Sequence, residues 1–223
     1  MGTAERRERE REHVRTLILE AARDLLSEEG LSALSMRAIA ERIEYSPGTI
    51  YLYFRDKDEL IAQVVEEGFE RLRESVEREL SALAETANAA EQYGAIGRAY
   101  VRFALENTAY FRVMFELPGS ARFECTREER EAEAGPKVFD SVVETIERAG
   151  REGSFRVADA RRAALIGWGM VHGLVSLYVG RHMVPDVASN EEFLVLVEEA
   201  MRSIDTGWRP RAGEETKESR RGA

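Results

Sequence analysis

Apolar residues recur at steps of three and four along most of the chain, which is the spacing of one face of an α-helix. Two short helices are predicted near residues 36–43 and 47–54, followed by a long helix from Asp56 to Leu80. Further helices are predicted over about 90–107, 109–117, 138–149, 158–183 and 191–204. No stretch shows the alternation that is typical of a β-strand, so the sequence predicts an all-α fold.

Residues 35–60 (SMRAIAERIEYSPGTIYLYFRDKDEL) carry the clearest signals for helix ends. Ser35 and Ser46 are residue types that cap helix N-termini. Asp56, with Glu59 three residues later, predicts the start of the long helix. Two short helices joined by a tight turn form the unit that places its second helix in the major groove of DNA. This stretch therefore predicts a DNA-binding helix-turn-helix.

The second short helix begins with side chains that suit a DNA surface. Pro47, favoured at the first helical position, and Gly48 present little bulk, so the backbone N–H groups can approach a phosphate. The hydroxyls of Ser46 and Thr49 can donate to a phosphate or a base edge, and the Thr49 methyl can contact a thymine methyl.

The larger side chains that follow divide into two groups. Ile50 and Phe54 lie four residues apart on one face, and we expect them to pack in a small core. Tyr51 and Tyr53 carry phenol donors on apolar rings, and we expect them to contact DNA rather than to be buried.

From about Val14 to Leu60 the chain resembles the N-terminal domain of the tetracycline-repressor (TetR) family of transcription regulators. The order and spacing of the matching residues carry the resemblance: Ile18, Ala21, Ala22, Leu25, Leu26, Gly30, Ser35, Ile39, Ala40 and the run SPGTIYLYFRDKDEL. The resemblance implies that these residues contact DNA: Met36, Arg37, Tyr45, Ser46, Pro47, Gly48, Thr49, Tyr51, Tyr53 and Lys57. Leu52 departs from the family pattern, and it either contacts a thymine methyl or contributes little.

The charge balance argues against indiscriminate DNA binding. The net charge is −10, and residues 1–60 hold ten Arg or Lys against thirteen Asp or Glu. Arginine and glutamate alternate over 5–12, which predicts a solvated segment or a frayed helical extension, and a groove contact by its arginines is left open. Arg37 and Lys57 are the cations expected beside the groove. We therefore expect weak non-specific binding and specific binding that weakens as salt rises.

A second resemblance covers about Ala95–Ile204. It rests on AALIGWGMVHGLVSLYVGRHM and, upstream, on AYVRFALENTAYFRVMFELPG, which are similar to the C-terminal regulatory domain of a family subset named for its Trp/His-Gly signature. Gly167, Gly169 and Gly173 lie inside a helical pattern, where glycine is unfavourable unless a ligand or another helix must come close.

A set of large side chains is expected to line a pocket for an apolar, aromatic effector: Tyr100, Phe103, Phe111, Met114, Phe115, Trp168 and His172. Taken singly, each of these residue types is more often part of a core than a ligand contact. His172 has two interpretations. The preferred one is a core histidine that donates to a backbone carbonyl, and the other is a polar group that orients the effector.

The resemblance also implies assembly and regulation. A homodimer is expected on a palindromic operator in double-stranded DNA, with the helices over 158–183 and 191–204 as the dimer interface. The favoured function is a ligand-responsive repressor that a small, largely apolar effector releases from DNA, with activation as an open alternative. The long helix from Asp56 would link effector binding to the recognition helix, with a coupling of about 1–3 kcal/mol.

Composition argues against other classes. No apolar run approaches the about 18 residues of a membrane helix, and no basic amphipathic face suits a membrane surface. Three histidines and one cysteine, far apart, argue against a metal site, and no cofactor is expected. Neither Cys125 nor His172 has a catalytic partner, so an enzyme is not expected. The single cysteine favours a reducing compartment, and we expect a cytoplasmic protein.

The predicted organisation has four segments. A flexible N-terminal tail over 1–12 precedes the helix-turn-helix domain over 13–60. The helical effector-binding and dimerisation domain covers 61–206, with a loop or an exposed helix start near 120–135. A polar tail over 207–223 is expected to be disordered.

Overall fold

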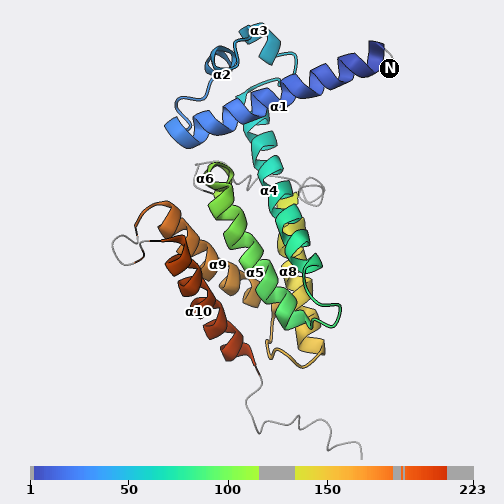
Figure 1. The fold of residues 1–223 in the computed structure, drawn as a ribbon, viewed down its shortest axis with the longest axis vertical. Coiled ribbons are helices and arrows are strands. Elements are labelled where there is room, and N and C mark those ends of the chain that lie inside the picture. The colour runs from blue at the N-terminus through green and yellow to red at the C-terminus, as the bar shows by residue number, and fades with distance from the viewer. Residues whose placement is uncertain (1–2, 116–133, 183–186, 188, 210–223) are drawn as a thin grey trace, which may run out of the picture. The chain divides into compact units, whose positions relative to one another are not determined.

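The structure is a computed structural model that describes residues 3–115, 134–182, 187 and 189–209. Within these ranges all regular structure is helical, which confirms the predicted all-α fold (Figure 1). The chain divides into a first unit, Met1–Arg73 with Phe103–Pro136, and a second unit, Glu74–Arg102 with Lys137–Ala223. Cys125, most of the segment expected as a loop at 120–135, and the tail from residue 210 lie outside the described residues.

The first unit is built from α1 (Thr3–Glu29), α2 (Met36–Arg42), α3 (Pro47–Ile50), most of α4 (Lys57–Ser81) and α6 (Thr108–Phe115). Helices α2 and α6 both pack against α1, and α2 packs against α3. The core consists of side chains that are at most 2% exposed, among them Ile18, Ala22, Ile39, Ile50, Phe54, Leu60 and Val64. The prediction that Ile50 and Phe54 are core residues is confirmed.

Helix α1 begins before the predicted start of the helix-turn-helix domain at residue 13. It begins at Thr3, so residues 3–12, expected as a flexible tail or a frayed extension, continue the helix, with exposed side chains from Glu5 to His13. It ends at Glu29 and is followed by Gly30, whose φ of +80° is readily available to glycine. The extension is therefore a solvated helix in this structure.

Reciprocal hydrogen bonds cap the start of α4. The Asp56 carboxylate accepts the Glu59 N–H at 2.8 Å, and the Glu59 carboxylate accepts the Arg55 N–H at 2.7 Å. Asp56 thus caps the helix start that the sequence predicts and satisfies one of its free donors, while Glu59 binds the N–H of the residue before the cap.

Helix α4 also holds the first residue of α8 (Ala134–Arg151). The Glu66 carboxylate accepts the Ala134 N–H at 2.9 and 3.2 Å, and both residues belong to the first unit. The negative charge lies at the positive end of the α8 dipole, where it is stabilising.

The second unit contains the end of α4, most of α5 (Ala89–Glu106) and of α8, and all of α9 (Ala160–Val179) and α10 (Asn190–Trp208). Helix α9 packs against α10. One cluster of its core joins α5, α8 and α9 through Ala89, Ile146, Ala149, Phe155, Ala163 and Ala164.

Two boundaries differ from the sequence prediction. The predicted start of the tail at Gly207 is wrong, because α10 continues to Trp208. The Trp208 ring lies 5.5 Å from the Phe155 ring and 5.6 Å from the Tyr93 ring, so it is part of the second unit's packing. The compact units also do not divide at residue 60, because α6 belongs with the helix-turn-helix.

Helix α9 is long and apolar enough to cross a membrane by length and composition alone. This corrects the expectation that no apolar run approaches that length. One such helix is weak evidence for a membrane span, because the core helix of a globular protein passes the same test. One face of α9 packs into the second unit through Ala163, Ala164, Gly167, Val171 and Val175.

Candidate nucleic-acid interface

A tight turn joins α2 to α3 and fixes how α3 begins. Glu44 has a φ of +60°, a left-handed conformation that few non-glycine residues adopt, and the Tyr45 N–H donates to the Ala40 carbonyl at 2.8 Å. The Ser46 hydroxyl then accepts the Thr49 N–H at 3.2 Å. The helix-turn-helix predicted from the sequence is therefore present, with the predicted cap.

Nine of the ten predicted DNA contacts are accessible in the first unit. Six are exposed, namely Arg37, Tyr45, Ser46, Pro47, Gly48 and Tyr51, and three are half-buried, namely Thr49, Tyr53 and Lys57. Tyr51 is 58% exposed, which fits its expected role in contacting DNA better than a core role. Leu52 is 75% exposed, so it is available to a thymine methyl, and both interpretations of its role stay open.

Met36 is the exception among the ten. Its side chain is 7% exposed and is buried on the same helix as Ile39 and Ala40. An apolar thioether gains more from burial in the core than from facing water, so the side chain turns inward. The expected DNA contact of the Met36 side chain is therefore corrected to a core contact.

The packing of the protein gives no reason for glycine at position 48. A methyl group added there would meet only the Ser46 hydroxyl oxygen, at 3.7 Å, which is an ordinary van der Waals contact. Its backbone does not adopt the left-handed conformation that favours glycine. The protein's own packing and backbone conformation therefore do not require glycine at this position.

Several charges near this surface are held in pairs. Arg42 of α2 binds Glu28 of α1 at 2.6 Å, and Arg55 binds Asp56 at 2.8 Å. The Glu59 backbone N–H and the Arg55 guanidinium lower the pKa of the Asp56 carboxyl. Pairing therefore reduces the negative field that the acidic composition would otherwise direct at a phosphate.

The two expected cations differ in their surroundings. Arg37 is exposed and forms no ion pair with the described residues. The Lys57 ammonium donates to the Leu31 carbonyl at 2.8 Å, which uses one of its three donors. The sequence pattern does not predict that Lys57 binds the Leu31 carbonyl. Lys57 is thus anchored on the protein and retains donors for a phosphate.

Three of the predicted effector residues meet in the second unit. A ring nitrogen of His172 lies 2.7 Å from the Tyr100 hydroxyl and the other lies 3.4 Å from the Ser176 hydroxyl. The Trp168 ring lies 5.5 Å from the His172 ring and 6.1 Å from the Phe139 ring. Burial lowers the pKa of His172 and raises the pKa of Tyr100, so both groups are neutral near pH 7.

The other four predicted effector residues belong to the first unit. Phe103, Phe111 and Met114 are at most 2% exposed, and the Phe111 and Phe115 rings lie 5.2 Å apart. Each of them is a packed residue in this structure, as expected of such residues taken singly. Their role in binding an effector stays a prediction.

A shallow hollow of about 730 Å³ in the second unit contains none of the seven predicted effector residues; it is lined by Ile146, Glu147, Gly150, Arg151, Phe155, Arg156, Val157, Ala158 and Ala160. Among the described residues, no group of three or more His, Cys, Asp or Glu is arranged to hold a metal ion.

Comparison with known proteins agrees with this geometry. The family model described as bacterial regulatory proteins of the tetR family matches residues 18–64, and a tetracyclin repressor-like C-terminal domain model matches residues 94–201. The first match contains the whole of α2, the turn and α3. The second supports a TetR-type C-terminal domain, while the Trp/His-Gly subset stays a prediction.

Curated relatives match over part of the chain. The HTH-type transcriptional regulator UidR of Escherichia coli K12 is 40% identical over 72 residues, which cover 30% of this chain and 37% of that protein. The HTH-type transcriptional repressor KstR of Mycolicibacterium smegmatis is 36% identical over 78 residues, covering 35% of this chain and 36% of that protein. The chain thus matches little more than a third of these relatives' lengths.

Solved structures match over nearly the whole fold. A Rhodococcus sp. RHA1 protein of unknown function has a TM-score of 0.71 at 27% identity and covers 88% of this chain and 95% of its own. The TetR family regulator PfmR of Thermus thermophilus shares the fold, with a TM-score of 0.63 at 22% identity over 85% and 97% of the two chains. The same conclusion follows from the helix-turn-helix geometry, the two family models and these relatives. The chain belongs to the TetR family of bacterial transcriptional regulators, and it is not an enzyme.

Proposed function

We propose that the protein is a cytoplasmic, ligand-responsive repressor that binds a palindromic operator as a homodimer and leaves it when a small, largely apolar effector binds. The observation that carries DNA recognition is the start of α3. Gly48 is exposed there without any need for glycine in the protein's own packing, beside the hydroxyls of Ser46 and Thr49. A phosphate or a base edge can approach this backbone closely.

An exposed apolar face supports the dimer. Leu165, Ile166 and Leu177 of α9 and Leu194 and Val195 of α10 are 43–60% exposed. Exposed apolar patches of this kind mark protein–protein contacts. The face matches the two predicted interface helices, and a two-fold pair of them would serve two half-sites about 34–36 Å apart.

Two glycines add to this argument. A methyl group added at Gly169 or Gly173 would meet nothing within 4 Å, so the protomer itself leaves the space beside both residues open. They lie four residues apart on α9, and therefore on one face. Glycine at such positions allows a partner helix to approach closely.

The aromatic cluster of the second unit supports the effector. The hydroxyl of Tyr100 and the ring of His172 provide hydrogen-bonding groups beside the Trp168 ring, which is 40% exposed. A few polar groups among aromatic side chains are typical of sites for small apolar ligands. Release from DNA would require the effector to bind the DNA-free state more tightly than the DNA-bound one.

The test is a selection of bound fragments from the source genome, followed by a promoter reporter. The wild-type protein should enrich a two-fold symmetric sequence and lower transcription from a promoter that contains it. Tyr51→Ala and Lys57→Ala should weaken binding, while Arg151→Ala, an exposed change in the second unit, should not. Absence of an enriched sequence would refute the DNA-binding proposal. Increased transcription would show that the protein is an activator and not a repressor.

A further inference from the structure

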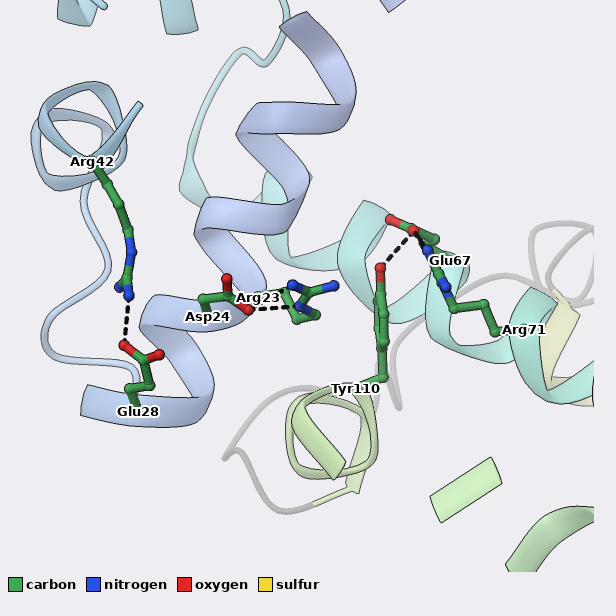
Figure 2. A network of polar contacts seen from close by, with 7 residues as sticks. All are labelled: Arg23, Asp24, Glu28, Arg42, Glu67, Arg71 and Tyr110. Carbon is green, nitrogen blue, oxygen red and sulfur yellow. Dashed lines mark hydrogen bonds and ion pairs between the residues drawn. The ribbon is translucent and has the colours of Figure 1, made fainter. Parts of the chain in front are cut away.

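Tyr110 of α6 lies between two guanidinium groups of neighbouring helices. The Arg23 guanidinium of α1 is 5.1 Å from the centre of the Tyr110 ring, and that of Arg71 on α4 is 4.8 Å from it. Figure 2 shows the two arginines on opposite sides of the ring. Tyr110 is only 2% exposed, and cations over a buried aromatic ring attract it more strongly than they would in water.

The phenol of Tyr110 completes the arrangement. It donates to the Glu67 carboxylate of α4 at 2.5 Å, and the same oxygen accepts the Arg71 guanidinium at 2.8 Å. Burial, followed by the hydrogen bond to Glu67, raises the pKa of Tyr110 to about 12, so the phenol remains a donor at any physiological pH. Arg23 is paired in turn with Asp24 at 2.7 Å.

These contacts join α6 to the helices that carry the DNA-binding surface. Helix α4 follows α3 in the chain, and α1 holds α2 through the pair between Glu28 and Arg42, which Figure 2 also shows. Gly68 allows the close packing of α4 on α6, because a methyl group there would collide with Met114 and press on the Tyr110 ring. Without the ring, two guanidinium groups would face each other across the gap.

We infer that Tyr110 is a positioning residue for DNA recognition, although it lies outside the helix-turn-helix. Its ring and its phenol set where α1 and α4 lie against α6, and so how each protomer presents α3. The inference rests on the proposed function, because the placement of α3 affects affinity most when two half-sites must be bound together. Removal of the Tyr110 hydroxyl should therefore change the half-site spacing at which the protein binds best, and it should leave the affinity for a single half-site unchanged.

The experiment uses the full-length protein and the operator that the wild type selects. Binding of wild type and Tyr110→Phe is measured on that operator, on variants with one or two base pairs added or removed at its centre, and on an isolated half-site. Tyr110→Phe keeps the ring between the arginines and removes only the donor to Glu67. We expect its affinity for the operator to fall about tenfold, within the usual range of coupling between sites, with half-site affinity unchanged and a shifted or broadened spacing preference.

Tyr93→Phe is the matched control. It removes the hydroxyl of a largely buried tyrosine in the second unit, whose ring packs against Phe155 and Trp208. Any general loss of stability from a tyrosine-to-phenylalanine change should appear in both variants. The change in spacing preference should appear in Tyr110→Phe alone.

Equal weakening of Tyr110→Phe at every spacing and on the half-site would overturn the inference and leave Tyr110 a structural residue. Unchanged binding would overturn it as well, while the proposed function would stand. If Tyr110→Phe did not fold, Arg23→Gln, which removes one cation from the ring, carries the same expectation. If the wild type selected no operator at all, the proposed function itself would fail.

Discussion

Ser46 and Thr49 are hydrogen-bonded to each other through their side chains, with 2.9 Å between the two hydroxyl oxygens. The Ser46 hydroxyl also accepts the Thr49 backbone N–H, so one oxygen caps α3 and faces the surface proposed to bind DNA. Under the proposed function, stability and recognition depend on the same atom, and a substitution can separate them.

Ser46→Asp should leave stability unchanged and weaken DNA binding. Aspartate caps a helix as well as serine does, but its negative charge would face the phosphates. We expect an affinity loss of about tenfold or more in a gel-shift titration, with an unchanged unfolding midpoint. Ser189→Asp, at the cap of α10 where the hydroxyl accepts the Glu192 N–H, is the control and should change neither. Wild-type affinity in Ser46→Asp would place the phosphates elsewhere.

Gly48→Ala should stabilise the protein while weakening its hold on DNA. Alanine favours the helix by up to about 1 kcal/mol over glycine, and nothing in the protein obstructs its methyl group. That methyl would lie where a phosphate or a base edge is proposed to approach. Urea unfolding and operator titration measure the two effects. Gly207→Ala, in open space on α10, should stabilise without any effect on DNA binding.

Lys57→Gln should lower the salt dependence of operator binding. Each phosphate contact that is lost reduces the slope of log affinity against log salt by about 0.9. The variant should also be somewhat less stable, because the Leu31 carbonyl loses its donor. Lys137→Gln, an exposed change on α8, provides the comparison. An unchanged slope would mean that Lys57 serves only to hold the Leu31 segment.

Ile166→Glu should produce monomers. The side chain is 60% exposed in the single chain, and a carboxylate buried in the proposed interface would lack a partner. Light scattering should show half the wild-type mass, and operator affinity should fall to that of one half-site. Arg151→Glu places the same carboxylate on α8 and should remain dimeric. Persistence of the dimer in Ile166→Glu would place the interface elsewhere.

Stability should fall as the pH drops below about 6.5, the ordinary pKa of histidine. Burial lowers the pKa of His172, so the unfolded chain takes up a proton there before the folded protein does. The stabilisation is complete above the unfolded value and is lost as the pH falls toward the folded one. Urea unfolding between pH 5 and 8, compared with His172→Gln, measures it. The variant should remove this component, because the component depends on the His172 ring.

The helix-turn-helix could be predicted because its signals are local. Ser35, Ser46 and Asp56 each cap a helix through a donor three residues away, and those spacings are visible in the sequence. The pair Ile50 and Phe54 follows from helical periodicity alone. Most of the candidate DNA surface could therefore be predicted from contacts between residues that are close in the sequence.

The parts that could not be predicted depend on partners far apart in the chain. The bond from Tyr110 to Glu67 spans 43 residues, and nothing near either residue specifies it. Trp208 follows a charged and polar stretch that resembles a tail, yet its ring packs on Phe155. Met36 is a different case: it lies three and four residues before the core residues Ile39 and Ala40, so helical periodicity favours its burial although the family resemblance implies a DNA contact.

The bond from Glu66 to the first residue of α8 bears on how regulators of this kind can be recombined. A chimera joined within α4 after Arg71 would set foreign residues opposite Glu66 and Glu67, which would then lose the Ala134 N–H and the Tyr110 hydroxyl as donors. A graft that transfers α6 and the first turn of α8 together with α1 to α4 keeps Ala134 and Tyr110 in place. The exchangeable module is therefore discontinuous in sequence, and a successful transplant of a new sensing domain needs more than one junction.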